Sequence, residues 1–117
     1  VGSAEQHNAF LGERDALISE AETLARRVQT YLGGRGVEGA EKLSRAIRRE
    51  VSTARKATTL VHLQGVQNNL YGFVAEVNAA TSAPAVVAVR KRFPGERGVE
   101  VDVVALGGAA WIEVKFA

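Results

Sequence analysis

The chain has no cysteine, two prolines and only two histidines among its 117 residues. Without cysteine, disulfide bonds and thiolate metal sites are excluded, and a reducing compartment is permitted. The isolated His7 and His62 do not make a zinc site either. No apolar run approaches the length of about 18 residues that spans a membrane, and no basic start leads into an apolar signal segment. We therefore expect an intracellular protein, cytoplasmic or nuclear, with no membrane partner.

Hydrophobic residues make up 46% of the chain and charged residues 24%, close to the averages of globular domains. By length, the chain is one domain. Within that domain, we expect a helical hairpin over residues 1–65, and a helix with a three-stranded sheet over residues 66–117.

The formal net charge of +2 conceals an uneven distribution of charge. The start of the chain is acidic, whereas the middle is basic, and a second basic group surrounds the first predicted strand. Phosphate backbones attract such clusters, which favours nucleic acid as a partner. The candidate contacts are Arg48, Arg49, Arg55, Lys56, Arg90 and Arg92. The alternative is a solvated helix face that pairs with the acidic first helix.

Apolar residues repeat by threes and fours in three segments, which is typical of helices with one buried face. Ser3 and Gln6 have the spacing of a capping box, so we predict a first helix from Ser3 to Leu32. The pattern predicts a second helix from Val37 to Val61 and a third from Val66 to Ala80. The glycine-rich turn between the first two helices is short, which favours an antiparallel hairpin.

Two valine-rich segments after the helices predict strands, from Ala85 to Phe93 and from Val99 to Leu106, joined by a turn over residues 94–98. Gly107-Gly108 then predicts a type I′ hairpin into a last strand, because that turn needs positive φ at both central residues. The predicted fold class is α+β. A long antiparallel helix hairpin and a third helix accompany a three-stranded, mainly antiparallel sheet, whose helix-facing side is formed by Val101, Val103, Ile112 and Val114.

The hairpin register places Asp102 directly opposite Glu113, with Lys115 one pleat further along the same face. Two such carboxylates repel each other unless a cation lies between them, and their oxygen atoms suit Mg²⁺ or Mn²⁺. Lys115 would then orient a water or stabilise the charge of a phosphoryl transition state. Under the alternative interpretation, Lys115 forms a surface ion pair with Glu100, and both carboxylates are solvated.

An aspartate on one strand and a Glu-X-Lys triplet on the next resemble the signature of the PD-(D/E)XK nucleases and resolvases. Asp102 and Glu113-Val114-Lys115 supply these residues, and the resemblance covers residues 68–116. That fold often places another acidic ligand on the preceding helix, where this chain has Glu76. The resemblance implies catalysis by Asp102, Glu113 and Lys115, and a Mg²⁺ or Mn²⁺ site formed by Asp102, Glu113 and Glu76.

A second set of short motifs extends over residues 13–115. The motifs are Glu13-Arg14, Ala21-Glu22, Gly36-Val37-Glu38-Gly39, Lys42-Leu43, His62-Leu63-Gln64, Asn69-Leu70, Val86-Val87-Ala88-Val89, Val101-Asp102-Val103-Val104-Ala105, Gly107-Gly108 and Trp111. In their order the chain resembles an uncharacterised eukaryotic family named after a human chromosome seven open reading frame. The resemblance implies an N-terminal module of a longer protein with a PIN-like C-terminal domain, and it favours a binding or scaffolding role.

Two functions from different classes follow from these patterns. The first is an N-terminal module of a nucleic-acid-processing protein, with a nuclease-like scaffold and metal-dependent phosphodiester cleavage. The second is a non-catalytic protein-interaction or dimerisation module, in which the exposed edge of the last strand pairs two copies. Trp111 bears on both, since it either stacks a base or, as we expect, fills the gap between the hairpin and the helices. The discriminating feature is whether the carboxylates and the basic clusters share one face.

Overall fold

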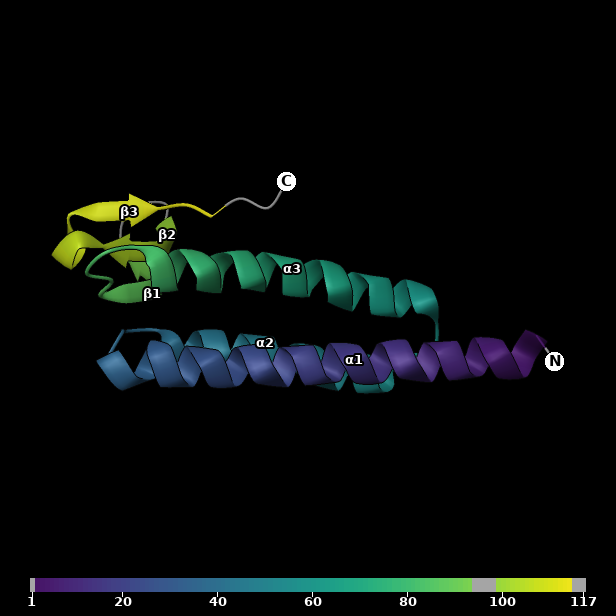
Figure 1. The fold of residues 1–117 in the computed structure, drawn as a ribbon. Coiled ribbons are helices and arrows are strands. Elements are labelled where there is room, and N and C mark those ends of the chain that lie inside the picture. Colours follow the sequence, from purple (N-terminus) through teal and green to yellow (C-terminus); the bar gives the residue numbers. More distant parts are fainter. Residues whose placement is uncertain (1, 94–98, 115–117) are drawn as a thin grey trace.

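A computed structural model describes residues 2–93 and 99–114. Over these residues the fold is α+β, as predicted, with three long helices and a three-stranded antiparallel sheet. The elements are α1 (Gly2–Tyr31), η1 (Gly33–Arg35), α2 (Ala40–Lys56), α3 (Leu60–Ser82), β1 (Ala88–Phe93), β2 (Val99–Ala105), η2 (Leu106–Gly108) and β3 (Ala110–Ile112). Figure 1 shows α1 and α2 side by side as an antiparallel hairpin, with α3 along one side of the pair and the sheet near the C-terminal end of α3.

The three helices pack through buried residues at helical spacing, which confirms the predicted hairpin and the third helix. Leu17, Ala21, Leu24 and Val28 form the stripe on α1, and the buried Leu32 continues it just after the helix. The buried residues of α2 are Ala40, Leu43, Ser44, Ile47, Val51 and Ala54, and those of α3 are Leu63, Val66, Leu70, Val77 and Ala80. Together with Val89 and Val103 of the sheet, these stripes form the main core.

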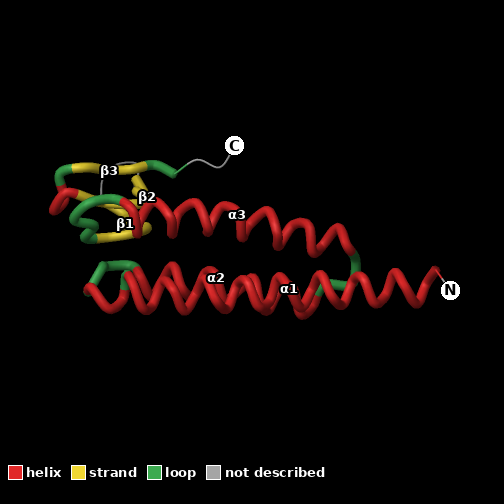
Figure 2. Tube along the Cα trace, in the orientation of Figure 1, coloured by secondary structure: helices red, strands yellow, loops and turns green. Residues whose placement is uncertain are grey.

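Several small residues line the contact between α1 and α2, and they allow the two backbones to approach closely. Ser44 is buried, and its hydroxyl donates to the Ala25 carbonyl across the helix pair (3.4 Å). The N-terminal end of α1 extends beyond the other helices (Figure 2), so residues 4–9 are exposed.

Helix α2 begins at Ala40, later than the predicted Val37, because the residues before it are held by the sheet. The Glu38 backbone pairs with β1 as an isolated parallel bridge. Gly39 then turns the chain into the helix with a φ of 84°.

Helix α2 also ends earlier than the predicted Val61, because the next helix, α3, already begins within the segment that the apolar pattern assigned to α2. Ala57 is extended after Lys56 (φ −65°, ψ 138°), which ends α2. Thr59 caps α3 by accepting a hydrogen bond from the His62 N–H (3.3 Å). Helix α3 therefore begins at Leu60, more than one and a half turns before the predicted Val66.

The predicted hairpin between the last two strands is confirmed. Val103 pairs with Ile112 and Val104 with Trp111, in the expected antiparallel register. Gly107 and Gly108 have φ values of 66° and 105°, as a type I′ turn requires. The first strand begins at Ala88 rather than Ala85. The predicted turn over residues 94–98 lies outside the described residues.

The alternation of side chains along the sheet breaks in the middle of β1 and β2. Val89 of β1 and Val103 of β2 point into the main core. Their neighbours Arg90 and Asp102 would point to the other face of a regular sheet, but they also point toward α3. Val101 consequently lies on the other face. The prediction that Val101 packs with Val103, Ile112 and Val114 is wrong, and its actual partners are Ala88, Val104 and Phe93.

Candidate functional site

Three charged side chains from three elements meet between α3 and the sheet, in a region we call the acidic pocket. Glu76 comes from α3, Asp102 from β2 and Arg90 from β1. The Arg90 Nε donates to the Glu76 carboxylate (3.1 Å), and its guanidinium carbon lies 5.0 Å from the centroid of the Phe73 ring. Asp102 accepts a hydrogen bond from the Val114 N–H (2.8 Å). These residues line a pocket of about 350 Å³ together with Asn68, Asn69 and Gly72.

Burial raises the pKa of Glu76 above its usual value. The Arg90 guanidinium opposes this shift, whereas the neighbouring Asp102 carboxyl, within hydrogen-bonding reach, adds to it. A proton or a cation between Glu76 and Asp102 would relieve their repulsion, and Arg90 already relieves part of it.

The predicted metal ligands are brought together only in part. Glu76 and Asp102 converge, and their oxygen atoms are of the kind that Mg²⁺ or Mn²⁺ prefers. Strand β3 ends at Ile112, so the predicted strand pairing of Asp102 with Glu113 does not form, and Glu113 is exposed. Lys115 lies outside the described residues. Within the described residues, no three or more His, Cys, Asp or Glu side chains lie together in a way that could hold a metal ion.

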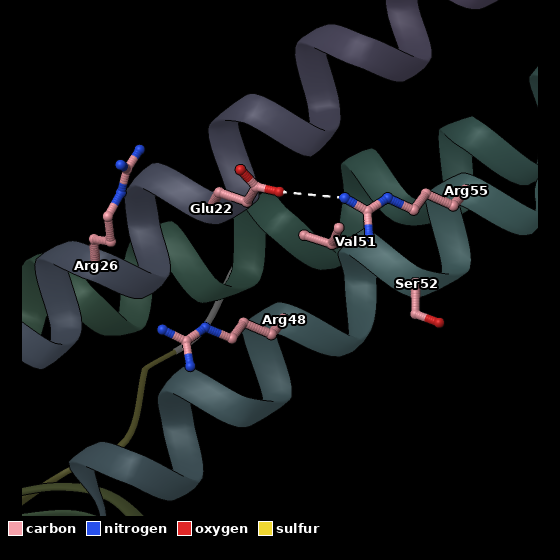
Figure 3. Close-up of a pocket in the computed structure, with 6 residues that line it drawn as sticks. All are labelled: Glu22, Arg26, Arg48, Val51, Ser52 and Arg55. Carbon is pink, nitrogen blue, oxygen red and sulfur yellow. Dashed lines mark ion pairs between the residues drawn. The ribbon is translucent and has the colours of Figure 1, made fainter.

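A second site is a groove between α1 and α2, which we call the arginine groove. Its volume is about 410 Å³, and Glu22, Arg26, Arg48, Val51, Ser52 and Arg55 line it. In Figure 3, Arg48 and Arg55 reach from α2 toward α1, whereas Arg26 lies on α1 and α3 passes behind the pair. Arg55 lies 3.6 Å from the Glu22 carboxylate, and Arg48 donates to the Gln29 side chain (2.8 Å).

The six predicted nucleic-acid contacts separate into different parts of the molecule. Only Arg48 and Arg55 line the arginine groove. Arg49 and Lys56 are exposed elsewhere on α2, and Arg92 is exposed on β1, 3.7 Å from Glu100. Arg90, by contrast, is largely buried in the acidic pocket.

The carboxylates and the arginines of α2 therefore do not share one face. The acidic pocket lies between α3 and the sheet, and the arginine groove lies between α1 and α2. Sequence reasoning missed Arg26, because it lies in the acidic first helix. Its spacing of four residues from Glu22 on α1 is the signal that places it beside this groove.

The outer face of the sheet, turned away from α3, carries an aromatic pair that we call the aromatic platform. The rings of Phe93 and Trp111 stack with centroids 4.5 Å apart and an interplanar angle of 24°. Trp111 is 57% exposed. The prediction that Trp111 fills the gap between the hairpin and the helices is therefore wrong.

The chain matches no protein-family model, and searches of curated proteins and of solved structures find no significant match. The two family resemblances in the sequence thus stay predictions. Among the described residues, no helix combines the length and the apolar character needed to cross a membrane.

Proposed function

We propose that this chain is a nucleic-acid-binding module of an intracellular nucleic-acid-processing protein, and that it holds phosphates in the arginine groove. The observation that carries the proposal is the charge of the groove. Three arginines and one glutamate line it, which leaves a net charge of +2 (three positive minus one negative). Such a groove contacts a phosphate backbone without reading its base sequence.

A phosphate would replace weak contacts that the arginines of the groove already make. The ion pair between Arg55 and Glu22 is long, and both side chains are well exposed (65% and 48%). Exposed pairs of this sort contribute little to stability. A guanidinium binds a phosphate through two parallel hydrogen bonds, which the side chains of Arg48 and Arg55 offer in this groove.

The test is fluorescence anisotropy of a labelled oligonucleotide, with the Arg48→Ala, Arg55→Ala double variant. We expect weaker binding and a salt dependence that falls by roughly 0.7 to 0.9 in log–log slope for each lost phosphate contact. Arg45→Ala is the matched control, because Arg45 lies on α2, is 66% exposed and pairs with Glu41 outside the groove. Equal losses in both variants would show that only the overall charge matters, and would contradict the proposal.

The acidic pocket supports a second candidate function, which is Mg²⁺- or Mn²⁺-dependent phosphodiester cleavage on a nuclease-like scaffold. Glu76 and Asp102 would hold the ion, and a bound ion supplies charge stabilisation and an activated water. Arg90 would shift from Glu76 toward the phosphate. Catalytic roles for Glu113 and Lys115, and metal binding by Glu113, rest on the family resemblance alone.

Calorimetric titration of Mn²⁺ or Mg²⁺ tests the second candidate. We expect saturable heat in the wild type and its loss in the Glu76→Gln, Asp102→Asn double variant. Glu41→Gln, on the exposed face of α2, serves as the control. Binding that survives the double variant, or no binding up to millimolar metal, would refute a metal site in the acidic pocket. Glu113→Gln, measured separately, tests the residue that the resemblance adds.

The alternative is a non-catalytic interaction module that forms a homodimer through the edge of β3. Within the described residues, β3 has no strand beyond it, whereas the edge of β1 is partly covered by the Glu38 backbone. However, β3 is three residues long, so few backbone hydrogen bonds are available to a second copy. Sedimentation equilibrium over a range of concentrations distinguishes a monomer from such a dimer.

A further inference from the structure

The outer face of the sheet combines exposed aromatic rings with a hollow. Phe93 and Trp111 come from the two outer strands, β1 and β3, and their rings meet over β2. A stacked pair that is buried needs no further partner, but Trp111 is more than half exposed. A ring surface therefore stays open to a planar ligand.

The hollow lies beside the platform and has a volume of about 340 Å³. Ala88 and Val104 form its apolar floor, and the Phe93 ring forms one wall. Glu38 and Lys91 provide polar groups at its rim. This combination of an apolar floor and a few polar groups is typical of small-molecule sites.

One cationic side chain of β1 lies beside the Phe93 ring. The Lys91 Nζ lies 5.7 Å from the centroid of the Phe93 ring, and it also pairs with the Glu38 carboxylate (2.6 Å). Arg92, the next residue along β1, points to the opposite face, where its side chain lies 3.7 Å from Glu100. A cation beside an open aromatic surface complements a base whose flanking phosphates are negative.

We propose that the aromatic platform stacks an unpaired nucleobase, while Lys91 contacts an adjoining phosphate. The inference deepens the proposed function, on which it rests, by assigning single-stranded nucleic acid as the ligand. In a duplex, each base presents its faces to its neighbours, so Trp111 has no open base to stack on. Phe93, Trp111 and Lys91 lie outside the arginine groove, so the two sites are separable by mutation.

The experiment compares a labelled oligothymidine strand with the same strand in a duplex. Trp111→Ala is expected to weaken single-strand binding about 5-fold to 150-fold and to leave duplex binding unchanged. Trp111→Phe should retain most of the affinity, because it keeps an aromatic ring. Tyr31→Ala is the matched control, since Tyr31 is similarly exposed (52%) but lies on α1.

A measurement on the wild type covers the case in which a variant fails to fold. Trp111 is the single tryptophan of the chain, so its emission reports on the platform alone. Bound oligothymidine should quench this emission and protect it from acrylamide. Unchanged acrylamide quenching at saturating oligothymidine would overturn the proposal.

The outcomes separate this inference from the proposed function. If Trp111→Ala binds the single strand like the wild type, the platform is refuted and the arginine groove is untouched. If the Arg48→Ala, Arg55→Ala variant binds normally while Trp111→Ala loses single-strand affinity, the groove is refuted and the platform is supported. A dimer that Trp111→Ala dissociates, with oligothymidine binding intact, would assign this face to a second copy of the chain and refute base stacking.

Discussion

Gly39 lies where the connection between α1 and α2 meets β1. A Cβ atom at this position would lie 2.1 Å from the Val89 carbonyl oxygen, and the φ of Gly39 is +84°. Two backbone hydrogen bonds hold this contact, from the Glu38 N–H to the Val87 carbonyl (3.0 Å) and from the Val89 N–H to the Glu38 carbonyl (2.8 Å). The substitution Gly39→Ala must therefore push the connection away from β1.

The size of the effect follows from these contacts. A left-handed backbone costs a residue other than glycine about 1 to 2 kcal/mol. Loss of the two hydrogen bonds adds about 1 kcal/mol each. We therefore expect Gly39→Ala to lower the free energy of unfolding by about 3 to 4 kcal/mol. Gly36 is a matched control, because its φ is +71° but nothing lies within 4 Å of its Cβ position. Gly36→Ala should cost only the backbone strain.

Urea denaturation, followed by far-ultraviolet circular dichroism, measures both variants. The difference between their free energies of unfolding isolates the contact with β1 from the strain that the two glycines share. If Gly39→Ala costs no more than Gly36→Ala, the connection between the helical hairpin and the sheet does not depend on this approach, and the reasoning fails.

Two further predictions concern the helices. Leu43 is fully buried, so Leu43→Ala should lower the free energy of unfolding by about 2 to 5 kcal/mol in urea, while the neighbouring exposed Lys42→Ala changes it little. Burial raises the pKa of Glu50, although Asn69 donates to one of its oxygens (3.1 Å). The other oxygen is buried and has no hydrogen-bond partner among the described residues. Since the pKa is higher in the folded state, the contribution of Glu50 to stability is present at low pH and is lost as the pH rises through that pKa. Glu50→Gln should therefore raise the melting temperature at neutral pH, and the gain should shrink as the pH approaches about 4; a gain independent of pH would contradict this account.

The elements that depend on local sequence were predictable. Apolar residues at helical spacing gave the buried faces of α1 and α3, and Gly107-Gly108 gave the β2–β3 register. The ends of α2 were not predictable in the same way. Its start depends on the Glu38 backbone pairing with β1, which is a contact between distant parts of the chain. Its end depends on the Thr59 cap, a local signal that the apolar pattern concealed.

In the candidate site too, the local pattern was predictable and the contacts between distant parts of the chain were not. Alternation along an ideal strand put Asp102 on the face opposite Val103. In the structure both residues face α3, which is why Asp102 meets Glu76 rather than solvent. The resemblance to the nucleases pointed to Glu76, but no periodic pattern predicts this change of face. Trp111 differed from expectation for a related reason, since its exposure depends on how the sheet packs against α3.

Arg90 connects the break in alternation to the chemistry of the acidic pocket. Its φ is 47°, a left-handed value that costs a residue of this kind on the order of 1 to 3 kcal/mol. Such a conformation persists only where the surroundings compensate for it, and Arg90 gains an ion pair with Glu76 and a contact with the Phe73 ring. The pairs on either side, Val89 with Val103 and Lys91 with Val101, put Arg90 level with Asp102. The same distortion therefore brings both charges to α3. The strained backbone and the paired carboxylates are therefore one feature, and a substitution that relaxes Arg90 into ordinary strand geometry would also dismantle the pocket.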